Sequence, residues 1–174
     1  MNTKRLTLSS LLIAIGAMAS HLIYIPAGVA KCYPVQHAIN VISAIVLGPW
    51  YAGGIAFAIS LLRNILGTGS PLAFPGSVLG AVLAGFVYYK TKSRYKAILG
   101  EVFGTGILGA LVAYPVAKFL LGRDVAALFF VLPFMASTIV GSVIGYVLLS
   151  RVDVSTLAKI DLKSSGMMSS DNWK

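Results

Sequence analysis

Long apolar stretches, separated by short polar breaks, run along most of the chain. They cover approximately residues 6–25, 35–47, 50–66, 72–89, 97–121 and 125–150. A helix needs about 20 apolar residues to cross a hydrocarbon core about 30 Å thick. The pattern therefore predicts an all-α integral membrane protein. We expect a compact bundle of six transmembrane helices over residues 1–151 and a flexible cytoplasmic tail over residues 152–174.

The second and third stretches are short for complete crossings, and only Gly48 and Pro49 separate them. They can be tilted helices, or a re-entrant pair enclosed by the rest of the protein. Both alternatives return the chain to the same side of the membrane. The predicted orientation is therefore the same in either case.

Composition supports the membrane class. Hydrophobic residues make up 57% of the 174 residues, charged residues make up 11%, and the mean hydropathy is +0.87. A soluble domain carries roughly 25% charged residues. A chain of this length that crosses the membrane six times has no room for a separate soluble domain. If an ATP-driven motor acts on it, we expect that motor to be another chain.

The net charge of +9 does not indicate nucleic-acid binding, because the basic residues lie between apolar stretches. Cytoplasmic loops of membrane proteins carry an excess of lysine and arginine. With the N-terminus inside, the outer side holds Lys31, Arg63, Lys118 and Arg123, and the inner side holds the other ten of the 14 basic residues. This bias predicts that both termini are cytoplasmic.

Most polar side chains at membrane depth fall near the outer ends of the predicted helices. Such groups are costly in lipid unless they are paired or wetted, so they predict a polar cavity that opens to the outside. Among them, Gln36, His37 and Asn40 begin the second helix, Arg63 and Asn64 close the third, and Tyr114 and Lys118 share a face of the fifth.

Other chemistry finds little support in the sequence. The one cysteine and the two separated histidines make a metal centre improbable, and no H-E-x-x-H pair indicates a protease. Glu101 is the one acid inside an apolar stretch. Its place near the inner boundary favours a structural or interface role over a proton relay.

Small residues recur at four-residue spacing, which lets helices approach closely. In the fourth and sixth helices we expect this spacing to serve packing inside the bundle. Ser10 and Ala14 lie near the cytoplasmic end of the first helix, where they can instead contact a partner subunit. The other small residues at this spacing are Gly76, Gly80, Ala84, Ser137, Gly141 and Gly145.

Several blocks of the chain resemble the S components of energy-coupling-factor (ECF) vitamin transporters, most closely the ThiW type. The resemblance covers about residues 4–150. The first blocks are Ala30-Lys31-Cys32-Tyr33-Pro34-Val35-Gln36-His37, Asn40 and Leu47-Gly48-Pro49-Trp50-Tyr51. Further blocks are Leu62-Arg63-Asn64, Gly67-Thr68-Gly69, Ala73-Phe74-Pro75-Gly76-Ser77, Gly100-Glu101, Gly104-Thr105-Gly106 and Ala113-Tyr114-Pro115-Val116-Ala117-Lys118.

This resemblance implies a protein of the prokaryotic plasma membrane that captures a thiamine precursor, a hydroxyethylthiazole-like compound, without a cofactor. Its implied partners are a transmembrane coupling subunit and two ATPase subunits. The loop after the first helix would act as a lid. The expected ligand-binding residues are Lys31, Tyr33, Gln36, His37, Asn40, Arg63, Asn64, Thr68, Phe74, Ser77, Tyr114 and Lys118.

The resemblance also implies that small residues of the first helix dock onto the coupling subunit. Here they are Ser10, Ala14 and Ala17, with serine where the family's A-x-x-x-A motif begins with alanine. Two other functions remain open at this point. One is a stand-alone secondary transporter or channel for a small vitamin-like solute, and the other is a purely structural membrane subunit.

Overall fold

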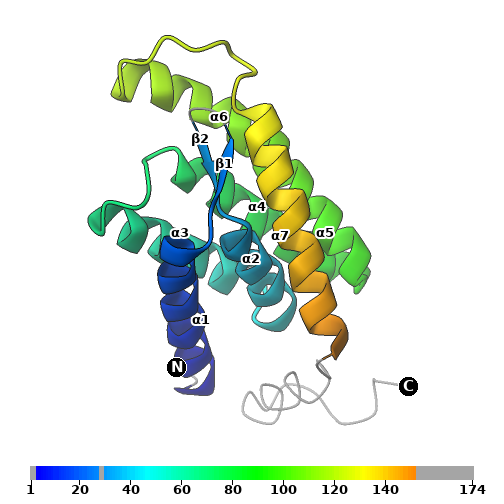
Figure 1. Ribbon diagram of the computed structural model, residues 1–174. Coiled ribbons are helices and arrows are strands. Elements are labelled where there is room, and N and C mark those ends of the chain that lie inside the picture. The colour runs from blue at the N-terminus through cyan, green and yellow to red at the C-terminus, as the bar shows by residue number, and fades with distance from the viewer. Residues whose placement is uncertain (1–2, 28–29, 152–174) are drawn as a thin grey trace, which may run out of the picture.

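The computed structural model describes residues 3–27 and 30–151, and the predicted tail at 152–174 lies outside the described residues. Within these ranges the chain forms helical rods and one short hairpin (Figure 1). The elements are α1 (Thr3–Leu22), β1 (Ile25–Ala27), β2 (Ala30–Cys32), α2 (Pro34–Val46), α3 (Pro49–Ile65), α4 (Ala73–Thr91), α5 (Arg94–Phe103), η1 (Gly104–Gly109), α6 (Ala110–Pro115), η2 (Val116–Leu120) and α7 (Val131–Arg151).

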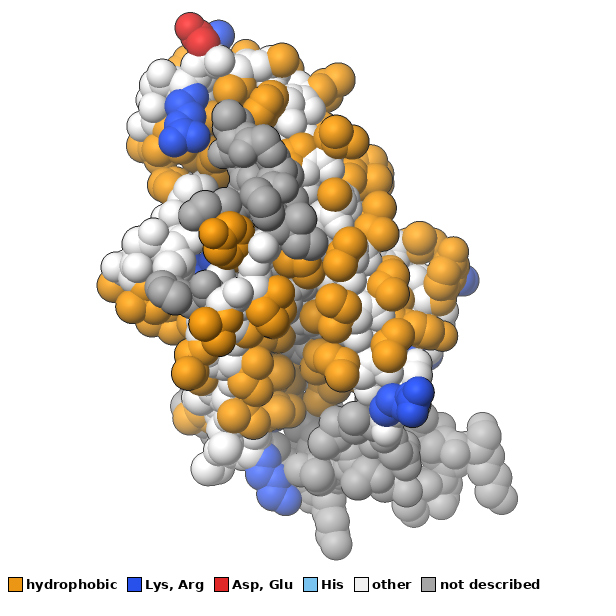
Figure 2. All heavy atoms as spheres, viewed as in Figure 1, with side chains coloured by type: hydrophobic (Ala, Val, Ile, Leu, Met, Phe, Trp, Pro, Cys, Tyr) orange, Lys and Arg blue, Asp and Glu red, His pale blue; other side chains and the backbone are white. Residues whose placement is uncertain are grey.

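The predicted all-helical bundle is confirmed in outline. The segments α5, η1, α6 and η2 join into one continuous helical rod, which makes six rods together with α1, α2, α3, α4 and α7. Two of the described helices, Arg94–Leu120 and Val131–Arg151, are long and apolar enough to cross a membrane. Large hydrophobic side chains lie on the outside of the rods, as Figure 2 shows for one face. Trp50 is 76% exposed and Phe119 is 81% exposed. Surfaces of this kind suit lipid rather than water.

Helix α2 lies at the centre of the bundle and contacts α1, α3, α4, α5 and α7. Ten of its 13 residues are buried. At about 1.5 Å per residue the helix is about 20 Å long, which is shorter than a hydrocarbon core. Pro34 begins the helix, and Gly48, with a φ of 89°, turns the chain into α3. The short second stretch is therefore an enclosed central helix.

Two boundaries differ from the sequence prediction. The first helix ends at Leu22 rather than near Ile25, and Ile25 instead begins β1 of the antiparallel hairpin β1–β2. The last helix begins at Val131 rather than near Val125. The hydrophobic pattern does not distinguish an apolar strand or loop from a helix end, so it predicts helix at both boundaries.

Glycine contacts hold α4 against the rod that begins with α5. A Cβ atom added at Gly104 would lie 2.7 Å from Cα of Gly80, and one added at Gly100 would lie 3.1 Å from Cα of Ala84. On α7, a Cβ atom at Gly145 would lie 2.9 Å from the carbonyl oxygen of Ala38. The predicted packing role of small residues in the fourth and sixth helices is therefore confirmed.

Candidate functional site

A cavity of about 540 Å³ lies at the hairpin end of the bundle. Its wall includes the residue after β2, the first turns of α2 and α4, the end of α3 and the start of α7. Small-molecule sites have volumes of about 300–1,000 Å³ and combine apolar walls with a few polar groups. This cavity has both properties, which makes it the candidate ligand site.

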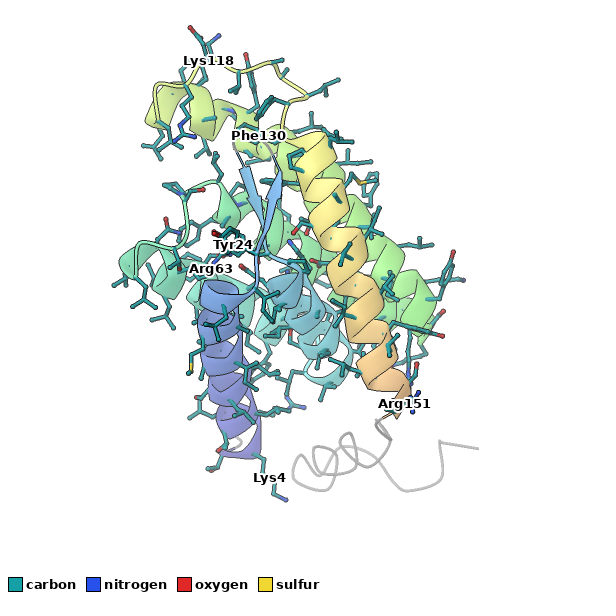
Figure 3. The ribbon with its side chains drawn as sticks, viewed as in Figure 1. Lys4, Tyr24, Arg63, Lys118, Phe130 and Arg151 are labelled. Atoms are coloured by element: carbon teal, nitrogen blue, oxygen red, sulfur yellow. The ribbon has the colours of Figure 1, made fainter. Side chains whose placement is uncertain are left out.

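Aromatic side chains form one wall. The ring centroids of Phe129 and Phe130 lie 5.2 Å apart at 90°, and those of Phe130 and Phe134 lie 5.9 Å apart. Phe130 is 3% exposed and stands near the tip of the hairpin in Figure 3. Rings held in this way offer faces and edges on which a flat heterocycle can pack.

Arg63 and Gln36 form a polar wall of the cavity. The Arg63 side chain is 2% exposed and donates from Nη1 to Oε1 of Gln36, while its Nε has no hydrogen-bond partner. Nε2 of Gln36 donates to Oγ of Ser60 at 2.9 Å and to Oγ of Ser77 at 2.6 Å. These bonds fix the Gln36 amide between α3 and α4, so the polar wall is built before any ligand arrives.

Tyr33 joins the hairpin to the rest of the site. Its hydroxyl donates to the carbonyl oxygen of Thr68 at 2.6 Å, and its backbone N–H donates to Oγ of Ser137 at 2.9 Å. The guanidinium carbon of Arg63 lies 3.5 Å from the centroid of the Tyr33 ring. A single residue therefore connects β2 with the loop after α3 and with α7 across the cavity.

A buried hydrogen-bond network lies under the cavity at His37. Nδ1 of His37 lies 2.9 Å from Oε1 of Glu101, and Nδ2 of Asn40 donates to the same oxygen at 3.0 Å. Both Glu101 and Asn40 are 0% exposed. The sequence left a structural role and an interface role open for Glu101, and the burial of this carboxyl group inside the bundle agrees with the structural one.

The widened helical turns of η1 place Thr105 in the cavity wall. Oγ1 of Thr105 lies 3.0 Å from the carbonyl oxygen of Gly76 and 3.1 Å from Oε1 of Glu101. Turns of the π-helical type occur frequently at functional sites. Here the turn supplies one polar group to the wall and supports the carboxyl group beneath it.

The expected ligand-binding residues divide into two groups. Six of them line the cavity: Tyr33, Gln36, His37, Arg63, Thr68 and Ser77. Asn40 lies beneath it, and the amide of Asn64 donates to the carbonyl oxygens of Ser60 and Ser70. The Phe74 ring packs against Phe57 with centroids 5.3 Å apart, outside the cavity wall.

Tyr114 and Lys118 are not among the cavity-lining residues. Nζ of Lys118 lies 5.9 Å from the Tyr114 ring, and Figure 3 shows Lys118 far from Arg63 at the end of the bundle. The rod beyond Thr105 leads away from the cavity, so the shared helical face of these two residues does not bring them to it. Lys31 belongs to β2, but its side chain lies outside the described part of the chain.

The sequence prediction missed two groups of lining residues. Thr105 had a signal, because it stands between two glycines in an apolar helix. Arg123 had little signal in the sequence, because a basic residue at a helix end is ordinarily assigned to lipid headgroups, and its neighbour Asp124 had none. The missed residues that add side chains to the wall are Ser70, Leu72, Ala73, Thr105, Arg123, Asp124, Val125, Phe129, Phe130, Pro133, Phe134 and Ser137.

No group of three or more histidine, cysteine, aspartate or glutamate side chains gathers anywhere in residues 3–27 and 30–151 in a way that could hold a metal ion. The cavity wall instead offers stacking surfaces and hydrogen-bonding groups. Such a site can bind and orient an aromatic polar molecule.

Comparison with known proteins agrees with this chemistry. Residues 6–155 match the sequence model of a family described as thiamine-precursor transporter protein (ThiW). Neither the curated proteins nor the solved structures contain a significant match. Because the family match spans most of the chain, the protein is a transporter rather than an enzyme and belongs to the ThiW family.

Proposed function

We propose that this chain is the substrate-binding S component of an energy-coupling-factor transporter. It captures a hydroxyethylthiazole-like thiamine precursor at the outer face of the membrane, for ATP-driven uptake with separate coupling and ATPase subunits. The observation that carries the proposal is the aromatic and polar cavity under the hairpin, in a member of a thiamine-precursor transporter family.

The chemistry of the cavity supports a thiazole alcohol as the ligand. Hydroxyethylthiazole is a small neutral ring with one hydroxyl group, one ring nitrogen and one sulfur atom. The ring would pack against Phe130 or Phe134, and the polar atoms would meet His37, Ser77 or Arg63, which all line the same space. The cavity contains both kinds of contact.

The distribution of charge supports an orientation with both termini in the cytoplasm. In Figure 3, Lys4 and Arg151 mark one end of the bundle and Lys118 marks the other. Basic residues gather on the cytoplasmic side of membrane proteins. In this orientation the chain is a multi-pass protein of a prokaryotic plasma membrane, and the hairpin covers a cavity that faces outward. Basic residues at the terminal end are Lys4, Arg5, Lys90, Lys92, Arg94, Lys96 and Arg151.

The exposed face of α1 supports docking onto a coupling subunit. Ser10 and Ala14 are exposed, and their small side chains leave room for a close helix contact. Ala17 does not belong to this surface, because it is only 5% exposed and faces the bundle. The proposed docking surface is therefore Ser10 and Ala14.

Binding of labelled hydroxyethylthiazole to the purified full-length protein tests the ligand assignment. We expect saturable binding of the labelled compound, and unlabelled hydroxyethylthiazole should displace it. Absence of thiazole binding together with tight binding of another vitamin would sink the assignment. Uptake of thiazole by vesicles that contain this chain alone, without ATP, would instead support a stand-alone secondary transporter or channel.

A further inference from the structure

We infer that Glu101 is a positioning residue that sets the specificity of the cavity through His37. In this arrangement Glu101 fixes the His37 ring so that Nε2 accepts a hydrogen bond, which selects a ligand that presents a neutral hydroxyl group as the donor. The inference rests on the proposed function and specifies one contact of the same site.

The orientation of the Asn40 amide decides which of its atoms faces Glu101. Nδ2 of Asn40 lies 3.1 Å from the carbonyl oxygen of Ser77, and a backbone carbonyl can only accept. The nitrogen of the amide must therefore face Ser77, which fixes the amide orientation through the network. The same nitrogen lies 3.0 Å from Oε1 of Glu101, so Oε1 also accepts from Asn40.

The His37 tautomer follows from this acceptor. An ionised carboxylate can only accept hydrogen bonds, so with Glu101 ionised the 2.9 Å contact between its Oε1 and Nδ1 of His37 places a proton on Nδ1. In a neutral imidazole one nitrogen donates and the other accepts. Nε2 is then the acceptor, and His37 lines the cavity where a ligand would meet it.

The surrounding helices hold the carboxyl group of Glu101 in place. A Cβ atom added at Gly80 would lie 2.7 Å from Oε2 of Glu101, so α4 closes against this side of the group. Glu101 and Asn40 are both 0% exposed. A carboxyl group confined in this way can keep its partner histidine in one orientation, as the partner groups of metal-binding histidines do.

The charges of the network favour a neutral ligand group. Arg63 contributes one positive charge and Glu101 one negative charge, and Gln36, Ser77 and Asn40 link them by hydrogen bonds. With His37 neutral, these charges balance. A neutral hydroxyl group can donate to the Nε2 lone pair, which a phosphate oxygen without a proton cannot do. The inferred tautomer therefore favours an alcohol at this contact.

Binding of two ligands to the purified full-length protein tests this role. One ligand is hydroxyethylthiazole, and the other is its methyl ether, which accepts but cannot donate a hydrogen bond. An unpaired buried acceptor costs enough that the alcohol should bind wild-type protein about tenfold or more tighter than the ether. In Glu101→Leu that preference should largely disappear, because leucine offers Nδ1 of His37 no acceptor.

Ser142→Ala is the matched control. Ser142 is also a buried polar residue without a hydrogen-bond partner at Oγ, but it does not line the cavity, so this variant should keep the preference for the alcohol. Equal weakening of both ligands by Glu101→Leu would overturn the inference and leave the ligand assignment standing. Failure of the alcohol to bind wild-type protein would overturn the proposed function itself.

The tautomer can also be measured without ligand, which covers the case that Glu101→Leu fails to fold. The chain has two histidines, so ¹⁵N-histidine NMR gives two ring signals, and His21→Gln assigns them. We expect the proton of His37 on Nδ1 and an unprotonated Nε2 in wild-type protein. A proton on Nε2 would overturn the inference, whatever the binding data.

Discussion

The guanidinium carbon of Arg63 lies 3.5 Å from the centroid of the Tyr33 ring, which places a buried cation flat against the residue that follows the hairpin. No acidic side chain within the described ranges forms an ion pair with Arg63. The cation is instead balanced by the Tyr33 ring, by Gln36 and by the wider polar network. The residue that follows the hairpin is therefore joined directly to the polar wall of the cavity.

Substitution of Tyr33 should weaken ligand binding in two steps. Tyr33→Phe removes the 2.6 Å bond to the carbonyl oxygen of Thr68, and loss of such a bond should reduce affinity about fivefold. Tyr33→Leu also removes the ring over Arg63 and should reduce affinity further. Isothermal titration with thiazole measures both. Equal affinity in all three proteins would contradict a closing role for Tyr33.

His37 and Asn64 should differ in their effect on binding. His37→Ala removes a polar group of the cavity wall and should weaken thiazole binding about tenfold. Asn64→Ala should change affinity little, because Asn64 does not line the cavity, and should lower thermal stability instead, because its amide bonds to the carbonyl oxygens of Ser60 and Ser70 are lost. A larger affinity loss for Asn64→Ala than for His37→Ala would show that the cavity is misassigned.

Much of the bundle was predictable from hydropathy, because apolar stretches of helical length report burial in any apolar environment. Gln36, His37 and Arg63 were predictable as site residues because polar groups at membrane depth need partners. Leu72 and Val125 were not, since an apolar residue in an apolar stretch has the same appearance in a cavity wall and in a core. For Glu101 the sequence left a structural and an interface role open, because sequence position gives depth along a helix but not which neighbours the side chain meets.

Gly80→Ala should destabilise the bundle. The added Cβ would lie 2.7 Å from Oε2 of Glu101 and would crowd Oγ1 of Thr105, and overpacking of this kind costs about 1–3 kcal/mol. Gly54→Ala is the control, because a Cβ there meets nothing within 4 Å. Thermal unfolding in detergent should show a lower midpoint for Gly80→Ala alone. Identical midpoints would contradict the close α4 contact.

Ala14→Trp should abolish co-purification with the coupling subunit and leave thiazole binding intact. Ala14 is exposed on α1, where an indole would separate two closely packed helices. Val143→Trp is the control, because Val143 is 54% exposed on α7, away from the proposed surface. Intact complexes from Ala14→Trp would refute docking through this face.

Thermal unfolding of the purified protein with and without thiamine precursors tests the central claim most directly, because a ligand that binds the folded state must raise its stability. We predict that hydroxyethylthiazole raises the unfolding midpoint in a concentration-dependent manner, and that His37→Ala reduces this shift. An unchanged midpoint at saturating thiazole, with a clear shift from an unrelated vitamin, would contradict the account.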